Sequence, residues 1–222
     1  DCIGDFNTPG QTGNKRQWDI RGATPTVRYC KITNPTPIGG VYGLATFDAT
    51  GTITLDHNDV RDAAAQDVIA GPDVGGGSNV LIVTETLIKG IHLTVGAHVD
   101  TIDGRGGAPG STISRNFIIG DKTPTSAPAG SGTGFTNAFH DLPTDPHGSP
   151  CNGWIIIENI IVGSDDPGAQ SIFVQVGNSA STGIRMYDII YDLREHNSLL
   201  HPSVRVDDWY ARSFDYAASL TA

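Results

Sequence analysis

The stretch HVDTID, from His98 to Asp103, places two side chains that could transfer protons two residues apart. In an extended strand His98 and Asp100 share one face with Ile102. A histidine beside a carboxylate could act as a general base that its partner orients. The alternative is a His–Asp hydrogen bond that only organises a loop, and we favour this alternative.

The acidic group GSDDPG could bind a cation through Asp165 and Asp166, and Asp207 and Asp208 follow later in the chain. Calcium takes six to eight oxygen ligands. Solvated turn aspartates explain the same residues, and we favour that explanation. We therefore expect no cofactor, with calcium as the one alternative.

Aromatic side chains could bind sugars, because the face of a ring packs against the C–H face of a pyranose. The candidates are Trp154, Phe173, Trp209 and Tyr210. Core packing is the alternative for Phe173, and capping of the last repeat is the alternative for Trp209 and Tyr210. The sequence has no Ser-His-Asp elbow, phosphate loop or zinc-ligand spacing.

The composition indicates a folded chain of strands and turns, with 28 Gly and 13 Pro in 222 residues and 17% charged residues. The net charge is −10 and Lys occurs four times, so we expect binding neither to nucleic acids nor to anionic membranes. No apolar run reaches the length of a membrane span. The start at Asp1-Cys2 is typical of a processed, mature chain, although a trimmed chain would look the same.

Three cysteines occur in the chain, Cys2, Cys30 and Cys151, and their spacing is not that of a metal finger. Cys2 and Cys30 could clip the N-terminal end together if the protein is secreted. Three unpaired thiols fit the sequence equally well.

A repeat organises most of the chain. Each unit has a small or polar start, alternating apolar residues, one polar position, two or three apolar residues, and then a short polar ending. The units are GTITLDHNDVRD from Gly51, NVLIVTETLIKG from Asn79, GSTISRNFIIGD from Gly110, GWIIIENIIVGS from Gly153 and TGIRMYDIIYDL from Thr182. A looser unit, TVRYCKITNP, starts at Thr26.

The polar positions of these units are 28, 30, 43 and 29 residues apart, and they are Asn58, Thr86, Asn116, Asn159 and Asp188. A propeller blade is longer than this period, and no 3.6-residue helical pattern is present. The period suits one turn of a parallel β-solenoid with two or three strands per turn. An antiparallel sandwich is the rival architecture, but it requires no polar residue at one phase of each repeat.

The polar positions have a structural explanation. Where a solenoid turn bends between two strands, backbone N–H and C=O groups point inward and need partners. A small amide can satisfy them, and stacked amides can bond to one another. We therefore interpret Asn58, Asn116 and Asn159 as structural rather than ligand-binding, with Thr86 and Asp188 as weaker members of the same series.

With the repeats placed, the stretch GAHVDTIDGRGGAPGSTISRNFIIGD resembles the signature region of right-handed parallel β-helix proteins of the pectate-lyase-like superfamily. Many of these carry H-x-D-G-(I/V)-Q before an N-x-I rung. His98 and Asp100 match, whereas Thr101 replaces the Gly and Asp103 replaces the Gln. The segments 154–192 and 204–216 are similar to the last coils of such proteins, found among bacterial secreted proteins and phage tail components.

The resemblance implies further candidates. Asp145-Pro146-His147 is similar to the Asp-Pro-His of alginate epimerases, which implies His147 as a base or acid and Asp145 as its partner. Gly148 stands where that family has an acidic residue, and a solvated turn is the alternative. Lyase chemistry also needs an Arg, and we place Arg105 among the substrate-binding candidates.

An open solenoid exposes sheet edges at both ends. The N-terminal stretch reads as a polar loop without a capping helix, so another chain could cover that end. We therefore expect a homo-oligomer or an assembly through the solenoid ends, which sedimentation as a clean monomer would contradict.

The sequence thus predicts an all-β fold, a single-stranded right-handed parallel β-helix (a solenoid) with about 29 residues per coil. It forms one domain, with an N-terminal loop or cap over 1–25, a long loop insertion over 122–150 and a C-terminal cap over 203–222. We expect a non-catalytic extracellular, cell-surface or virion module that could bind polysaccharide. The alternative is a polysaccharide lyase or uronate epimerase that acts on an acidic glycan.

Overall fold

The structure is a computed structural model that describes residues 2–5, 15–33, 41–46, 49–61, 67–71, 78–89, 92–93, 100–104, 106–119, 132–133, 137–141, 151–162, 172–176, 183–192 and 205–212. Within these residues the chain forms strands and no helix. The predicted all-β class is confirmed for this part of the chain.

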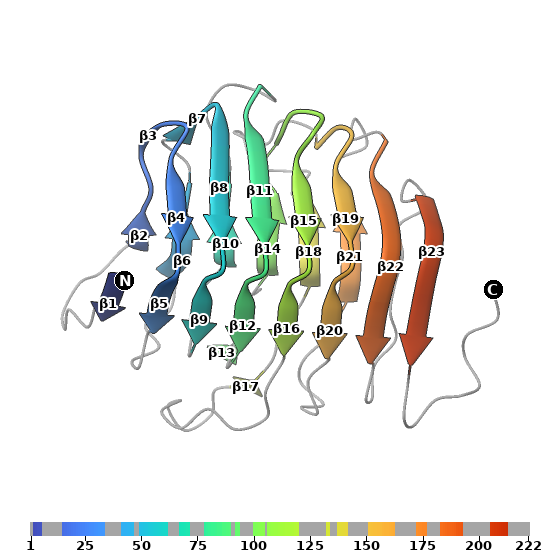
Figure 1. Ribbon diagram of the computed structural model, residues 1–222. Coiled ribbons are helices and arrows are strands. Elements are labelled where there is room, and N and C mark those ends of the chain that lie inside the picture. The colour runs from blue at the N-terminus through green and yellow to red at the C-terminus, as the bar shows by residue number, and fades with distance from the viewer. Residues whose placement is uncertain are drawn as a thin grey trace.

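The larger sheet contains 13 of the described strands, and all of its pairs are parallel. It faces the viewer in Figure 1, where each repeat contributes an upper and a lower strand. The upper strands are β4 (Thr26–Arg28), β8 (Thr52–Asp56), β11 (Val80–Thr84), β15 (Thr112–Ser114) and β19 (Ile155–Ile157). The lower strands are β1 (Cys2–Asp5), β5 (Cys30–Thr33), β9 (Asp59–Arg61), β12 (Leu87–Lys89), β16 (Phe117–Ile119) and β20 (Ile160–Val162). The longer strands β22 (Arg185–Asp192) and β23 (Arg205–Arg212) complete the sheet.

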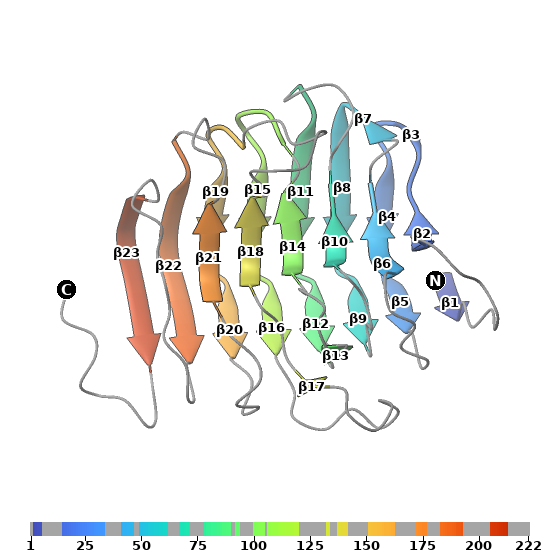
Figure 2. The same ribbon diagram turned by 180° about the vertical axis from the view of Figure 1, so that it is seen from behind.

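The second sheet has six described strands, also all parallel, and it lies behind the first (Figure 2). Its strands run β2 (Lys15–Asp19), β6 (Val41–Ala45), β10 (Asp67–Ala70), β14 (Asp100–Gly104), β18 (Asn137–Asp141) and β21 (Ile172–Val176). Two short pairs lie outside these sheets: β3 (Gly22–Ala23) with β7 (Ala49–Thr50), which is parallel, and β13 (His92–Leu93) with β17 (Gly132–Thr133), which is antiparallel.

The hydrophobic core follows from the alternation of apolar residues along the strands of the larger sheet. In β8 and β11, the side chains of Ile53, Leu55, Leu81 and Val83 are fully buried, because alternate side chains of a strand share one face. The parallel register sets equivalent residues beside each other from one repeat to the next. One such buried column is Ile32, Val60, Ile88, Ile118 and Ile161.

The predicted polar positions lie next to one another in space. We call Cys30, Asn58, Thr86, Asn116 and Asn159 the ladder positions. The backbone N–H of each of the first four donates to the side chain of the next, at N···O distances of 3.1, 3.4, 3.0 and 3.0 Å. These bonds join residues 28, 28, 30 and 43 positions apart. The stacking of the amides is therefore confirmed.

Each asparagine uses both ends of its amide. While Oδ1 accepts the N–H of the preceding ladder position, Nδ2 donates to a backbone carbonyl of the same preceding repeat. The carbonyls are those of Val27 for Asn58 at 3.1 Å, Val83 for Asn116 at 3.0 Å and Ile113 for Asn159 at 2.8 Å. Because an apolar side chain could supply neither group, the inward N–H and C=O would stay unsatisfied without the amide.

The other ladder positions are simpler. Thr86 donates its hydroxyl to the carbonyl of Thr84 at 3.0 Å, and the thiol of Cys30 makes the same contact with Arg28 at 3.5 Å. The loose first unit of the repeat is thus a full member, in which Cys30 stands where an amide would be. Asp188 lies in β22, but its side chain lies outside the described part.

Strands lie within the three stretches expected to be loops or caps. Residues 1–25 contain β1, β2 and β3, because Cys2–Asp5 pairs in register with Cys30–Thr33 and Lys15–Asp19 pairs with Val41–Ala45. The 122–150 insertion contains β18, which continues the second sheet and buries Phe139. The 203–222 cap contains β23, which pairs with β22. In each case the pairing partner of the strand lies one repeat away.

We predict that Asn116→Ala lowers the free energy of unfolding by about 3 kcal/mol or more, because it leaves the Thr86 N–H and the Val83 carbonyl buried without their partners. Urea unfolding measures the change. Thr112→Ala in the same repeat is the control, since its hydroxyl bonds only the nearby Gly110 carbonyl at an exposed position, and it should cost about 0.5 kcal/mol or less. Equal costs for the two variants would contradict the structural assignment of Asn116.

Candidate functional site

Six of the predicted site residues lie outside the described residues: His98, Arg105, Asp145, His147, Asp165 and Asp166. Their assigned roles stay predictions. Trp209 and Tyr210 lie in β23, opposite Ile189 and Ile190 of β22, but their side chains are not described.

Asp100 begins β14 and is 2% exposed. Its register partner in β10 is Asp67, which is also buried. All five residues of β14 are buried, so both faces of this strand are covered in the structure. Asp100 therefore contributes no exposed carboxylate here, and its predicted pairing with His98 involves a residue beyond the described ranges.

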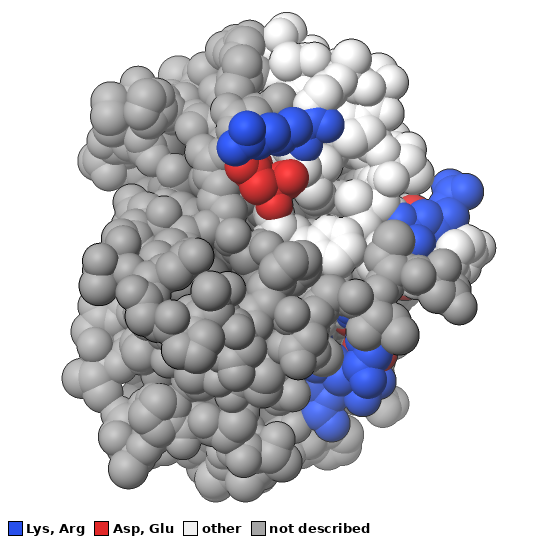
Figure 3. All heavy atoms as spheres, turned by 90° about the vertical axis from the view of Figure 1, so that its left-hand side faces the viewer, with Lys and Arg blue, Asp and Glu red and all other residues white. Residues whose placement is uncertain are grey.

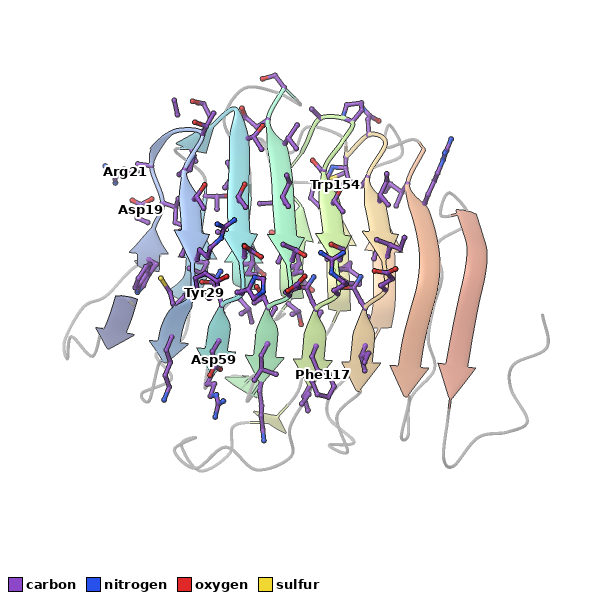
Figure 4. The ribbon with its side chains drawn as sticks, viewed as in Figure 1. Asp19, Arg21, Tyr29, Asp59, Phe117 and Trp154 are labelled. Atoms are coloured by element: carbon purple, nitrogen blue, oxygen red, sulfur yellow. The ribbon has the colours of Figure 1, made fainter. Side chains whose placement is uncertain are left out.

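Trp154 was predicted to bind substrate, but the structure places it in the core, at 4% exposure. Figure 4 shows it at the upper end of the larger sheet. The indole packs against Gly107, where an added Cβ would lie 2.6 Å from Nε1. A ring packed in this way presents no face to a sugar, so we do not assign Trp154 to a binding site.

The bends between upper and lower strands carry the most regular exposed feature of the described residues. The residue before each ladder position has a positive φ between 49° and 55°, although none is a glycine. We call these residues the bend column: Tyr29, His57, Glu85, Arg115 and Glu158. Side chains other than Gly adopt this conformation at a cost, and the bend column adopts it in five consecutive repeats.

Backbone hydrogen bonds between repeats hold this conformation. The N–H groups of Tyr29, His57, Glu85 and Arg115 each donate to a carbonyl of the next repeat, at 3.1 to 3.2 Å. The left-handed conformation also turns the N–H of the next residue, the ladder position, toward the interior. This N–H donates its hydrogen bond to the side chain of the following ladder position. The ladder and the bend column are therefore two sides of one local structure.

Four of the bend-column side chains, together with Arg28 and Asp56, form a continuous chain of contacts between basic and acidic groups along the surface. Nδ1 of His57 lies 2.6 Å from Asp56, and its Nε2 lies 2.5 Å from Glu85. Glu85 also accepts from Nε of Arg115 at 2.9 Å, and Arg115 reaches Glu158 at 3.7 Å. At the other end Arg28 pairs with Asp56 at 2.6 Å. Exposed pairs of this kind contribute little to stability, but they fix the side chains in one arrangement.

Both ring nitrogens of His57 are engaged by carboxylates of the chain. Nδ1 faces Asp56 of the same repeat, and Nε2 faces Glu85 of the next repeat. The imidazole therefore links two neighbouring repeats at the surface.

Tyr29 begins the bend column and is 57% exposed. Its ring centroid lies 5.0 Å from that of His57, tilted by 45°. Figure 4 shows Tyr29 where β4 meets β5, and Phe117, which is 42% exposed, on the lower strand β16. Phe117 lies beside Ile160 in register, and both are exposed. The surface thus presents one aromatic ring within the polar column and another outside it.

The bend column was missed by sequence reasoning, because its members share no chemical type. The available signal was their position, one residue before each polar slot of the repeat. Sequence reasoning also missed a further buried asparagine, Asn79, whose side chain accepts a hydrogen bond from the N–H of Gly51 at 2.8 Å. It supports the turn before β8 in the way that the ladder supports the bends.

Further ion pairs lie elsewhere on the described surface. Arg21 bonds Asp19 and Arg61 bonds Asp59 within their own loops or strands. Seen from the N-terminal end, the coloured basic side chains lie against acidic ones (Figure 3). The part of the chain that the structure describes holds no group of three or more His, Cys, Asp or Glu that could bind a metal. It also contains no helix long and apolar enough to cross a membrane.

No protein-family model, curated protein or solved structure matches the chain in the comparisons made.

We predict that Gly107→Ala lowers the free energy of unfolding by about 1–3 kcal/mol, because the new methyl group overlaps the indole of Trp154. In a Trp154→Phe background the cost should fall, since the atoms nearest the new Cβ are Nε1, Cζ2 and Cε2 of the indole. A double-mutant cycle by urea unfolding measures this coupling. Additive effects would show that the close contact is not the cause.

Proposed function

We propose that the chain forms a single-stranded right-handed parallel β-helix. The support is that five successive repeats, from β4 to β21, each add one strand to the second sheet and two to the larger sheet, in parallel and in register. Right-handed crossovers are the rule for parallel strands. A crystal structure with left-handed crossovers would contradict the proposal.

We further propose that this β-helix is a non-catalytic module of a cell surface or virion, and that it binds a neutral polysaccharide along the bend column. The observation that carries the proposal is the column itself. Five exposed side chains follow one another, one per repeat. With about 4.8 Å between neighbouring strands, they extend over about 19 Å. A straight, repeating surface of this kind suits a linear polymer with a repeating unit.

The chemistry of the column favours hydroxyl groups as partners. The exposed carboxylates of Glu85 and Glu158 accept hydrogen bonds, and the guanidinium groups of Arg115 and the adjacent Arg28 donate them. Because ion pairs already hold these side chains, little side-chain entropy remains to be lost on binding. The exposed ring of Tyr29 offers a face for the C–H side of a sugar.

The charge of the column and of the chain argues for a neutral ligand. Acidic and basic groups alternate along the column, so it offers no run of positive charge to a polyanion. The whole chain carries a net charge of −10, which repels polyuronates at long range. The lyase or epimerase alternative requires an acidic glycan, and its candidate residues His147 and Asp145 lie outside the described residues.

We predict that Tyr29→Ala weakens binding to a neutral polysaccharide about tenfold, which corresponds to about 1.4 kcal/mol. Affinity electrophoresis with a xylan, a glucomannan and a mixed-linkage β-glucan, followed by calorimetry on the best ligand, measures the effect. Phe117→Ala is the matched control, because it removes an exposed aromatic ring outside the column and should leave affinity unchanged.

Absence of binding to all three polymers, or an equal loss for Phe117→Ala, would overturn the assignment of the bend column. Pectate and alginate are included in the same panel. Release of unsaturated products from either one, or proton exchange on alginate seen by NMR, would support the enzymatic alternative instead.

A further inference from the structure

The N-terminal end of the amide ladder carries cysteine where the interior carries amides. Cys30 occupies the first ladder position and is 2% exposed. Its backbone N–H is accepted by Asn58 at 3.1 Å, and its sulfur lies 3.5 Å from the carbonyl oxygen of Arg28.

The residue beside Cys30 in the neighbouring strand β1 is also a cysteine. Cys2 is the register partner of Cys30 in the parallel pair of β1 and β5. Cys2 and Cys30 are 28 residues apart, which is the spacing of Cys30 from Asn58 and of Asn58 from Thr86. Cys2 is therefore the ladder position of one further repeat.

The strand pairing brings the two residues to the separation that a disulfide needs. Neighbouring strands lie about 4.7–4.9 Å apart, and bridged cysteines have Cα atoms about 4.4–6.8 Å apart.

The third cysteine, Cys151, lies too far from Cys30 to form a disulfide with it. Cys151 belongs to the repeat that contains Asn159. It is buried, and its backbone forms an isolated parallel β-bridge with Gly107. Four inter-strand steps, or about 19 Å, separate that repeat from the repeat of Cys30. This exceeds the reach of a disulfide about threefold, which leaves Cys2 as the partner for Cys30.

We propose that Cys2 and Cys30 are a disulfide site that closes the N-terminal end of the stacked repeats under oxidising conditions. With glutathione disulfide as oxidant, one cysteine thiolate attacks it and releases one glutathione, which leaves a mixed disulfide. The second thiolate then displaces the other glutathione and forms the Cys2–Cys30 bond. Two protein thiols are oxidised and one glutathione disulfide is reduced to two thiols, so the step balances.

The bond would link two neighbouring repeats covalently at this ladder position. It also closes a loop of chain that contains β2, β3 and β4. Closing a loop of this length restricts the unfolded chain, and in a chain of this size we expect the melting temperature to rise by about 5–10 °C.

The test uses the full chain, equilibrated with glutathione disulfide or with a reductant, then alkylated and mapped by mass spectrometry without reduction. We expect a linked pair of peptides that contain Cys2 and Cys30 in the oxidised sample, with Cys151 alkylated only after unfolding. Thermal unfolding of both samples then gives the shift. Alkylated Cys2 in the oxidised, folded protein, or a bond to Cys151, would overturn the proposal.

Three variants separate the bond from general effects on folding. Cys2→Ser removes the bond at a terminal strand and should abolish the redox-dependent shift without lowering the melting temperature of the reduced protein. Cys30→Ser should abolish the same shift, although it alters a buried position. Cys151→Ser is the matched control and should retain the full shift. A shift that survives in Cys2→Ser would contradict the assignment, whatever the outcome of the polysaccharide test.

Discussion

One backbone constraint shapes this molecule. A strand that bends without leaving its sheet turns an N–H group away from the neighbouring strand and into the core, where water cannot reach it. A buried donor without an acceptor costs free energy. The ladder positions supply that acceptor from the next repeat, and the asparagines among them also satisfy a carbonyl of the preceding repeat. The amide is small enough for the interior and carries both functions, which few other side chains do.

The same constraint determines what the surface presents. The inward turn of the ladder N–H requires a left-handed residue immediately before it, and that residue lies on the outside. Since the bend recurs in each repeat, its side chains form a column along the molecule whose chemical types are free to vary. Here they vary as Tyr, His, Glu, Arg and Glu, and contacts between basic and acidic groups join the last four. The proposed polysaccharide surface is thus an outward consequence of the proposed β-helical stacking.

The sequence predicted the part of the fold that depends on periodicity. The polar phase of the repeat identified Asn58, Thr86, Asn116 and Asn159, and their mutual contacts followed from parallel stacking in register. It could not predict Trp154 as a core residue, because the space for the indole comes from Gly107 in another repeat. It also missed β18, which lies in the stretch expected to be a loop insertion and depends on partners one repeat away. The bend column was hidden because a backbone conformation, and not a residue type, defines it.

The most direct test of the central claim is native-state hydrogen exchange by NMR at the backbone N–H groups of Cys30, Asn58, Thr86 and Asn116. If side-chain acceptors of the next repeat hold these groups, they should exchange as slowly as the N–H groups of the buried strands on either side, through global unfolding. Exchange at rates typical of exposed turns would mean that the ladder does not hold the repeats together, and would contradict the account.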